Sequence, residues 1–305
     1  MPLMAASEPV SGHPVRVFEA VVADVRDLSP HFRRVTFIGP SLLDFGVPGP
    51  TLDLRIKLLL PNPGHPLRLP GVNGVLQAGW YQDWLKQDQP GRGFIRSYTV
   101  RALRRAPSGP EVDVDFVLHR GPGSQPGPGS GWALEAAPGC PAWFVGPDIT
   151  AVTAATPLPE AGINWKPGRS DRVLLAGDET AVPAVSSILE ALPPQISGHA
   201  FLEVPDAADV LPIATQSGVH VTWLHRGSGD VPRGARLLAA VQQALASDTG
   251  TWHPYAWVGA EAATVRSLRR CLTESGVDPR ASELRGYWSL GKAGSGVNGI
   301  PVQQR

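Results

Sequence analysis

Residues 172–180 read RVLLAGDET, and at this stretch the character of the sequence changes. RVLLA is a short apolar run typical of a buried strand, and GDET is typical of a turn from a strand into a helix. Asp178 or Thr180 can cap that helix, and Pro183 is tolerated in its first turn. We therefore predict a strand over 172–176 and a helix that ends at about Leu192.

The chain beyond this turn alternates between apolar strands and helical segments. We predict strands at 199–204, 219–224 and 255–258, and helices at 235–246 and 262–275. Strands that alternate with helices indicate βα units built around a parallel sheet.

The chain before the turn contains short strands separated by glycine and proline. In the clearest one, residues 111–119, alternation places Val112, Val114, Phe116 and Leu118 on one face. Several short strands of this kind predict an antiparallel barrel or sandwich. The other predicted elements of this region are strands at 15–25, 33–38, 52–60 and 97–103, and one helix around 79–86.

The two halves predict two domains, in agreement with a length of 305 residues at roughly 150 residues per domain. We expect an antiparallel β-barrel over residues 14–148 and a parallel-sheet α/β domain over residues 171–290. Residues 149–170 are expected to be a linker, residues 1–13 an N-terminal extension and residues 291–305 a flexible tail.

Composition and charge exclude several classes of protein. There are 27 Lys and Arg against 27 Asp and Glu, and a formal net charge of zero argues against a general nucleic-acid binder. Cys140 and Cys271 are too few for a disulfide framework or a structural zinc site, and we expect no metal site. No signal peptide is visible, and no window approaches about 18 apolar residues. We therefore expect a cytoplasmic protein without a membrane segment.

Residues 96–101 read RSYTVR and could contact a flavin. A flavin needs an aromatic face against its ring, a small hydroxyl near its reactive nitrogen and a cation for its pyrophosphate. Arg96, Tyr98 and Thr99 can supply all three. Alternation places Arg96 and Tyr98 on one face of the strand and Thr99 on the other. Taken alone, the same residues also fit an ordinary strand with an exposed arginine.

Residues 121–133 read GPGSQPGPGSGWA and could approach a phosphate. Bare glycine backbone allows close approach, N–H groups and the Ser130 hydroxyl can donate, and a helix that starts near Ser130 would add a favourable field. A flexible surface loop explains the composition equally well. A competing Gly-Pro-Gly-Ser lies at 121–124, and we prefer the copy at 127–130 because Trp132 and Ala133 follow only that copy.

The order of these motifs, with DFVLH at 115–119 between them, resembles the siderophore-interacting protein family of flavin-dependent ferric-siderophore reductases. That family has a ferredoxin reductase-like fold. The resemblance covers roughly residues 15–292. Further matching segments are SPHFRRVTF at 29–37, LLAGDETA at 174–181, WVGAEA at 257–262 and GYW at 286–288.

The resemblance implies that the barrel binds FAD. Tyr98 and Thr99 would act at the reactive flavin ring. The residues expected to hold the cofactor are Arg96, Tyr98, Thr99, His119, Gly127, Gly129, Ser130, Trp132 and Ala133.

The resemblance also implies that the α/β domain receives NAD(P)H outside the carboxyl ends of its strands. The residues expected there are Gly177, Asp178, Glu179, Thr180, Gly259 and Glu261. A local basic pocket would attract an anionic substrate, although each candidate also fits ordinary surface charge or packing. The candidates for substrate contact are Lys57, Arg101, Trp288 and Lys292.

The implied function is reduction of a ferric siderophore to release Fe(II), with NAD(P)H or a reduced ferredoxin as electron donor. The iron arrives with its own chelator, so no protein ligand to the metal is required. Two alternatives stay open: a flavoenzyme of the same scaffold that acts on an organic substrate, and a non-catalytic siderophore- or flavin-binding protein. Three positions depart from the family pattern, with Gly129 in place of the usual alanine, Ser289 in place of a common arginine, and Cys140 in place of an aspartate.

Overall fold

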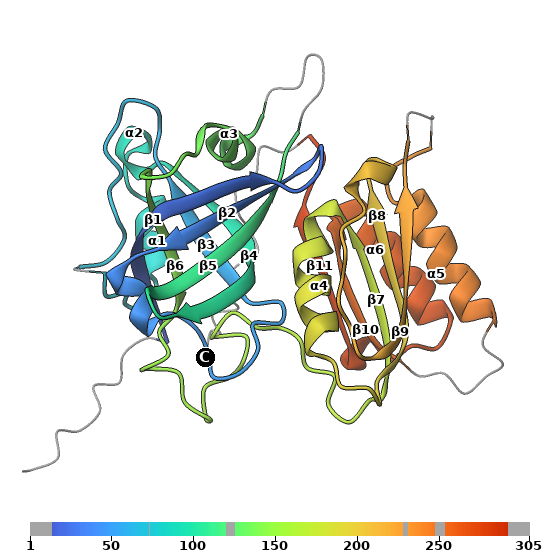
Figure 1. The fold of residues 1–305 in the computed structure, drawn as a ribbon. Helices are drawn as coiled ribbons and strands as arrows, with labels where there is room; N and C mark the ends of the chain where they lie inside the picture. Colours follow the sequence, from blue (N-terminus) through green and yellow to red (C-terminus); the bar gives the residue numbers. More distant parts are fainter. Residues whose placement is uncertain (1–13, 73, 120–125, 228–230, 248–253, 292–305) are drawn as a thin grey trace, which may run out of the picture.

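The computed structural model describes residues 14–72, 74–119, 126–227, 231–247 and 254–291, and it begins with a closed barrel (Figure 1). The antiparallel strands follow the order β1-β2-β5-β4-β3-β6, and pairing of β1 with β6 closes the barrel. The predicted antiparallel barrel is therefore confirmed. Its strands are β1 (Val15–Asp27), β2 (Phe32–Ile38), β3 (Arg55–Leu60), β4 (Phe94–Ala106), β5 (Gly109–Val117) and β6 (Pro141–Pro147).

The barrel interior is filled by the alternating apolar residues of its strands. Val112, Val114 and Phe116 of β5 are all at most 1% exposed, as the alternation predicted. On the opposite face of β5, Asp113 and Asp115 are also buried. Asp113 accepts a hydrogen bond from Thr36 and pairs with Arg104, and Asp115 pairs with Arg34. These partners compensate the buried carboxylates.

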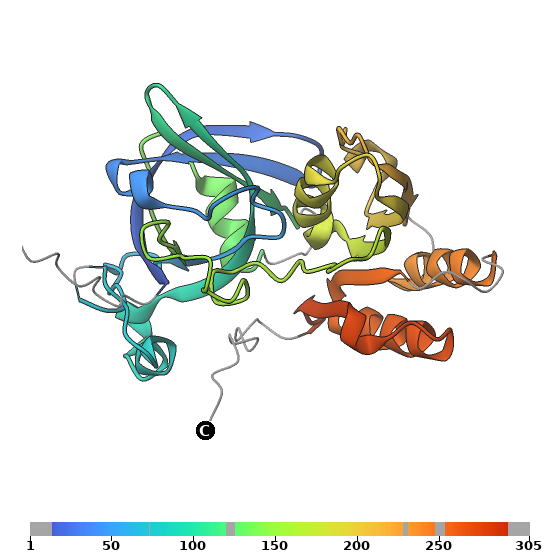
Figure 2. The same cartoon turned by 90° about the horizontal axis from the view of Figure 1, so that it is seen from below.

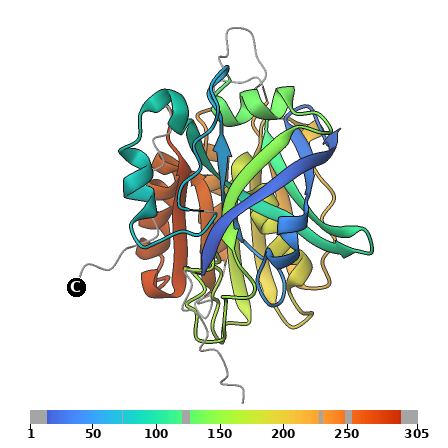
Figure 3. The same cartoon turned by 90° about the vertical axis from the view of Figure 1, so that its left-hand side faces the viewer.

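Short helices cover the barrel. α3 follows β5 in sequence and lies across one end of the barrel, which is the upper end in Figure 1. Figure 3, a view along the direction from barrel to sheet, shows α3 above the barrel and α1 and α2 beside it. These elements are η1 (Pro40–Asp44), α1 (Trp80–Leu85), α2 (Gln89–Arg92) and α3 (Pro128–Glu135).

The second half forms a parallel sheet in the order β11-β10-β7-β8-β9, which confirms the predicted parallel-sheet α/β fold. β7 is central and buried on both faces. Its Val173 and Leu175 belong to the core shared with the barrel, and its Leu174 and Ala176 belong to a second core. The strands are β7 (Arg172–Asp178), β8 (Ser197–Val204), β9 (Gly218–His225), β10 (Tyr255–Glu261) and β11 (Ser282–Trp288).

Helices cover the sheet on both faces. α4 lies on the face turned toward the barrel, where its Ser187 hydroxyl donates to the carbonyl of Arg101 on β4. α5 and α6 lie side by side on the other face (Figure 2). No helix of the described residues is long and apolar enough to cross a membrane. The helical elements are η2 (Glu179–Ala181), α4 (Val182–Ala191), η3 (Ala207–Asp209), α5 (Ala235–Ser247), α6 (Ala262–Glu274) and η4 (Pro279–Ala281).

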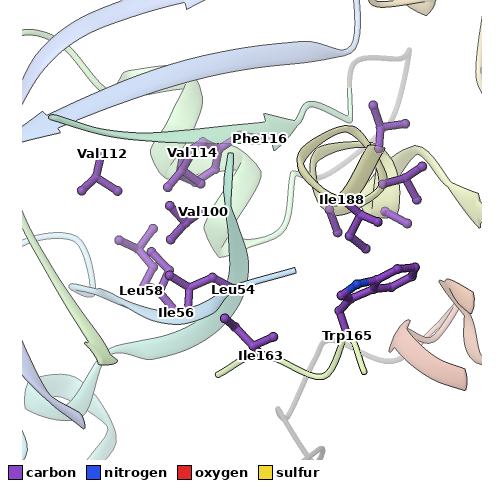
Figure 4. Close-up of a cluster of buried hydrophobic side chains, with 14 of the residues drawn as sticks. Leu54, Ile56, Leu58, Val100, Val112, Val114, Phe116, Ile163, Trp165 and Ile188 are labelled. Carbon is purple, nitrogen blue, oxygen red and sulfur yellow. The ribbon is translucent and has the colours of Figure 1, made fainter. Parts of the chain in front are cut away.

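One continuous apolar core joins the barrel to the sheet. Figure 4 shows it running from Phe116 and Leu54 of the barrel, past Ile163 and Trp165, to Ile188 of α4. Ile163 and Trp165 belong to the stretch 149–170 that we predicted to be a linker, and both are buried. The seam between barrel and sheet is therefore packed with side chains.

The buried Asp53 carboxylate connects three parts of the chain at this seam. Its Oδ1 atom accepts the backbone N–H groups of Asn164, at 3.1 Å, and Trp165, at 3.0 Å. Its Oδ2 atom accepts the indole N–H of Trp257 on β10, at 3.0 Å. Asp53 thus joins the loop before β3, the stretch 149–170 and the sheet.

Candidate functional site

β4 carries the predicted flavin-contact residues to the seam between barrel and sheet. The Tyr98 ring lies against Phe116, with ring centroids 4.3 Å apart, and burial raises the pKa of Tyr98. Thr99 points the other way, is 8% exposed and lies beside the Tyr287 hydroxyl of β11, whose pKa it lowers against the larger opposing effect of burial. Alternation along β4 therefore directs Tyr98 toward α3 and Thr99 toward the sheet.

Arg96 is a cation without a described counter-ion. Its guanidinium lies over the Phe94 ring, 5.5 Å from the centroid, and donates to the carbonyl of Ile95 at 2.8 Å. It forms no ion pair with any carboxylate in the described part of the chain, and burial lowers its pKa. A half-buried arginine in this state is suited to bind an anion.

The glycine-rich loop leads into α3. Gly127 is the N-cap and the helix begins at Pro128, two residues before the predicted start near Ser130. The Ser130 Oγ atom accepts the backbone N–H of His119 at 3.1 Å, so this turn is joined to the end of β5. The competing copy at 121–124 lies outside the described residues.

Trp132 and Ala133 fix α3 to the barrel. Trp132 stacks on Phe37, with centroids 6.0 Å apart, and lies 5.6 Å from the Phe116 centroid. Ala133 is fully buried. These contacts hold the first turn of α3 next to β4 and β5.

Asp178 organises the carboxyl ends of β7, β10 and β11. Its Oδ1 atom accepts the backbone N–H of Thr180 at 2.9 Å, and its Oδ2 atom accepts the backbone N–H of Glu261 at 2.8 Å. The Trp288 indole N–H also donates to Oδ2, at 2.9 Å. Burial, reinforced by the adjacent Glu179, raises the pKa of Asp178 to about 6. The structure thus brings together four of the predicted residues.

Glu179 binds two arginines that the sequence analysis missed. Arg226, directly after β9, pairs with Glu179 at 2.9 Å and with Glu203 at 3.2 Å. Arg233 also pairs with Glu179, and its guanidinium lies 5.0 Å from the centroid of the Trp288 ring. Burial opposes ionisation of Glu179, but the hydrogen bond from Arg226 and the charges of both arginines lower its pKa.

The predicted glycines of the sheet are explained by close packing. A Cβ atom on Gly177 would lie 2.5 Å from Ala181, and a Cβ atom on Gly259 would lie 3.0 Å from the Trp257 ring. Glu261 caps α6 by accepting the backbone N–H groups of its first turn. These three residues shape the strand ends.

A cluster of basic side chains lies where the barrel meets β11. Lys57 of β3 donates to the Ser97 hydroxyl at 2.8 Å. Burial, with the nearby charges of Arg55 and Arg285, lowers the pKa of Lys57 to about 8. Arg285 donates to Glu283 at 2.5 Å and to the Asn164 side chain at 3.0 Å. We call Arg55, Lys57 and Arg285 the basic cluster.

Arg101 has a different environment from the basic cluster. It donates to both carboxylate oxygens of Glu190 on α4, at 2.8 and 2.6 Å, so its charge is compensated. The two residues line a hollow of about 510 Å³ together with residues 47–51. None of the flavin-strand residues 96–99 lines that hollow. Lys292, the other basic candidate, lies outside the described residues.

Two family models match the chain. Residues 21–151 match the siderophore-interacting FAD-binding domain, and residues 170–291 match the siderophore-interacting protein model. The chain belongs to the siderophore-interacting protein family.

Relatives of this family align along nearly the whole chain. An uncharacterised protein of Mycobacterium tuberculosis is 33% identical over 291 residues, which is 93% of each chain. Ferric vibriobactin reductase ViuB of Vibrio cholerae is 31% identical and covers 91% of this chain and 92% of its own. A siderophore utilization protein from T. fusca has a crystal structure that is 30% identical, with a TM-score of 0.70 over 92% of this chain and 95% of its own.

The barrel residues fit the FAD that this family's N-terminal domain implies. The first N–H groups of α3 have no acceptor within the helix, and a Cβ atom on Gly127 or Gly131 would meet nothing within 4 Å. This turn therefore forms an open cradle for an anion at a helix N-terminus. Arg96 would supply the cation that a pyrophosphate requires.

The sequence analysis missed Arg55, Arg285, Arg226 and Arg233. Arg55 had a signal, because it lies two residues before Lys57 and alternation places both on one face of β3. Arg226 also had a signal, since it follows a predicted strand at the carboxyl edge of the sheet. Arg285 lies on a strand that was not predicted, and the loop position of Arg233 carries no pattern.

The three departures from the family pattern have different outcomes. Gly129 is explained by a contact with Tyr98, because a Cβ atom there would lie 2.0 Å from the Tyr98 hydroxyl. Cys140 is half-buried in the turn before β6, where its carbonyl accepts the backbone N–H of Val22 at 2.9 Å. Nothing in the structure explains Ser289.

Proposed function

We propose that this protein is an FAD-dependent ferric-siderophore reductase with NAD(P)H as its electron donor. The observation that carries the proposal is the convergence of Thr99, from the flavin-contact strand, with the basic cluster at one seam. Arg55 pairs with Thr99 in the β3–β4 ladder, and Thr99 in turn contacts Tyr287 of β11. The threonine expected to contact the flavin therefore lies beside a group of cations that would suit an anion.

The basic cluster supports an anionic substrate. Neither Arg55 nor Lys57 forms an ion pair with a described carboxylate. Burial and the charge of Arg285 lower the pKa of both residues, and the charge of Arg55 further lowers the pKa of Lys57. Like charges held together at partial burial destabilise a folded chain unless an anion compensates them. Ferric siderophores are commonly anionic chelates, so this cluster suits them.

The barrel and the sheet would divide the remaining work between them. Arg96 and the first turn of α3 would bind the pyrophosphate of FAD, with Tyr98 and Thr99 on either side of β4 positioning the ring. Asp178, Glu261 and Trp288 would shape the nicotinamide site at the strand ends, and Arg226 and Arg233 would offer cations to the phosphates of the donor. When bound, FAD would supply the capacity to accept two electrons together and release them one at a time, as Fe(III) requires.

The test is anaerobic reconstitution with FAD followed by stepwise addition of a donor and an acceptor. We expect a flavin absorbance spectrum, bleaching by NADH or NADPH, and return of the flavin absorbance when a ferric siderophore is added. A ferrous-specific chelator should capture Fe(II) in the same step. Failure to retain FAD after reconstitution contradicts the proposal.

The same experiment separates the alternatives. Bleaching by reduced ferredoxin but by neither nicotinamide replaces the donor assignment. Reoxidation by organic acceptors but not by ferric chelates indicates a flavoenzyme with an organic substrate. No bleaching by any donor indicates a non-catalytic binding protein.

A further inference from the structure

Gly129 has a feature that its backbone does not explain. It is the second residue of α3 and has helical geometry, which residues with a Cβ atom adopt readily. It is buried, and an added Cβ atom would lie 2.0 Å from the Tyr98 hydroxyl oxygen and 3.2 Å from the ring carbon that carries it. The tyrosine side chain is therefore what requires a glycine at this position.

Neighbouring glycines lack this constraint. Added Cβ atoms on Gly127 and Gly131, in the same loop and the same helix, would meet nothing within 4 Å. The contact with Tyr98 is thus specific to Gly129 within this glycine-rich turn. We call the space left by the missing Cβ atom the Gly129 notch.

The Tyr98 ring is held on its other side by β5. Phe116 lies 4.3 Å from it between ring centroids, with the two ring planes 46° apart. Trp132 of α3 also packs on Phe116. The ring is confined between Phe116 and the first turn of α3, so its orientation depends on how closely that turn approaches.

We propose that Gly129 is a positioning residue of the flavin site, because its notch receives the Tyr98 hydroxyl and sets the orientation of the ring. This inference rests on the proposed function, since it assigns the notch a role in FAD binding. The two motifs that meet here are those expected to contact the flavin ring and its pyrophosphate. The notch therefore links the positions of the two ends of the cofactor site.

The test is a double-mutant cycle with Gly129→Ala and Tyr98→Phe, measured in the absence and presence of FAD. Gly129→Ala should lower the Tm of the FAD-free protein by about 4 °C and raise the Kd for FAD about tenfold, as expected for overpacking at a confined site. In the Tyr98→Phe background the hydroxyl is gone, and the nearest ring atom to the new Cβ atom lies at 3.2 Å. Most of both effects of Gly129→Ala should then disappear.

Gly131→Ala is the matched control. It makes the same chemical change two residues further along α3, into open space, and should leave Tm unchanged or slightly raised because alanine favours a helix. Near-ultraviolet circular dichroism of the tyrosine should change in Gly129→Ala but not in Gly131→Ala.

The outcomes separate this inference from the proposed function. Equal effects of Gly129→Ala in both backgrounds, or a loss of Tm in the FAD-free protein no larger than that of Gly131→Ala, overturn the notch while wild-type FAD binding stands. A lowered Tm with rescue by Tyr98→Phe but an unchanged Kd for FAD overturns the positioning role. Absence of FAD binding by the wild-type protein overturns the proposed function and this role with it, even where the coupling in Tm is present.

Discussion

The two sides of the seam compensate their charges in opposite ways. On the sheet, Glu179 is 1% exposed and holds Arg226 and Arg233, and Arg226 is shared with the fully buried Glu203. On the barrel, Arg55 and Lys57 have no ion pair among the described residues, and burial together with the charge of Arg55 lowers the pKa of Lys57. The carboxylates of the sheet hold its own loops, whereas the barrel presents cations to something outside the chain. The barrel side therefore leaves more uncompensated positive charge for an external anion than the sheet side does.

The largest expected effect on stability comes from removing the Glu179 carboxylate that pairs with Arg226 and Arg233 on the sheet. Glu179→Gln removes the acceptor of two arginines and leaves Arg226 with only part of its counter-charge at low exposure. Breaking a buried ion pair on one side is strongly destabilising, so we expect the free energy of unfolding to fall by about 3 kcal/mol. Urea unfolding followed by circular dichroism measures this change. A loss below about 0.5 kcal/mol, the usual range for a surface substitution, would show that the network is not compensated as described.

The next effect comes from removing a cation of the basic cluster. Lys57→Met should raise the KM for an anionic ferric chelate about tenfold, which is the size of a lost hydrogen bond to a charged group. The free energy of unfolding should equal or exceed that of the wild type, because the substitution removes one of several like charges. Steady-state kinetics with an anionic and a neutral ferric chelate provide the comparison. An equal rise in KM for both chelates contradicts an electrostatic role for Lys57.

A smaller effect concerns pH. Burial first, then the charges of Arg55 and Arg285, lower the pKa of Lys57 from its ordinary 10.5 to about 8, so this side chain loses its charge as pH rises through 8. The KM for an anionic chelate should therefore rise a few-fold between about pH 7 and pH 9. Lys57→Arg should abolish that rise, because arginine stays charged in this range. A profile of KM against pH that is identical in wild type and Lys57→Arg would remove Lys57 from the substrate site.

The lowered pKa of Lys57 also makes the free energy of unfolding depend on pH. The folded state binds fewer protons than the unfolded state between pH 8 and 10.5, so the destabilising effect of Lys57 is relieved as pH rises through that window.

The smallest effect should come from the ion pair between Arg101 of β4 and Glu190 of α4. Glu190→Gln breaks the ion pair with Arg101, in which Glu190 is 32% exposed. Surface pairs of this kind contribute about 1 kcal/mol or less, so the free energy of unfolding should change little. FAD affinity and chelate KM should both be unchanged. A tenfold change in KM would restore Arg101 to the substrate site.

The sequence predicts the architecture well where the patterns are local. Nine of the strands and the three longer helices of the sheet follow from alternation and from glycine and proline boundaries. β6 was missed because its short run AWFVG lies between Pro141 and Pro147, with too few residues for a period to emerge. β11 was missed because it is an edge strand whose residues are all half-buried, so SELRGYW lacks a clear apolar alternation.

The candidate site likewise contains residues that local motifs predict and contacts between distant segments that they do not. Tyr98, Thr99, Asp178 and Glu261 stand in motifs that are readable along the chain, and the structure places them at the seam or the strand ends. The pairing of Glu179 with Arg233 joins residues 54 positions apart in sequence, and no pattern of either segment indicates it. The Gly129 notch is likewise a contact between two motifs. Each motif is readable in the sequence, but the sequence does not show that the two lie in contact.

Asp53 has a consequence for how this protein can be divided or recombined. One carboxylate accepts hydrogen bonds from Asn164, Trp165 and Trp257, so the barrel, the connecting stretch and the sheet share a single buried acceptor. A chain cut within residues 149–170 would expose that acceptor and the apolar surface around Trp165 on both fragments. A chimera that grafts this barrel onto another member's sheet would need an indole N–H or an equivalent donor at the position of Trp257. Recombination of the two halves is therefore limited by three donors that must be present together.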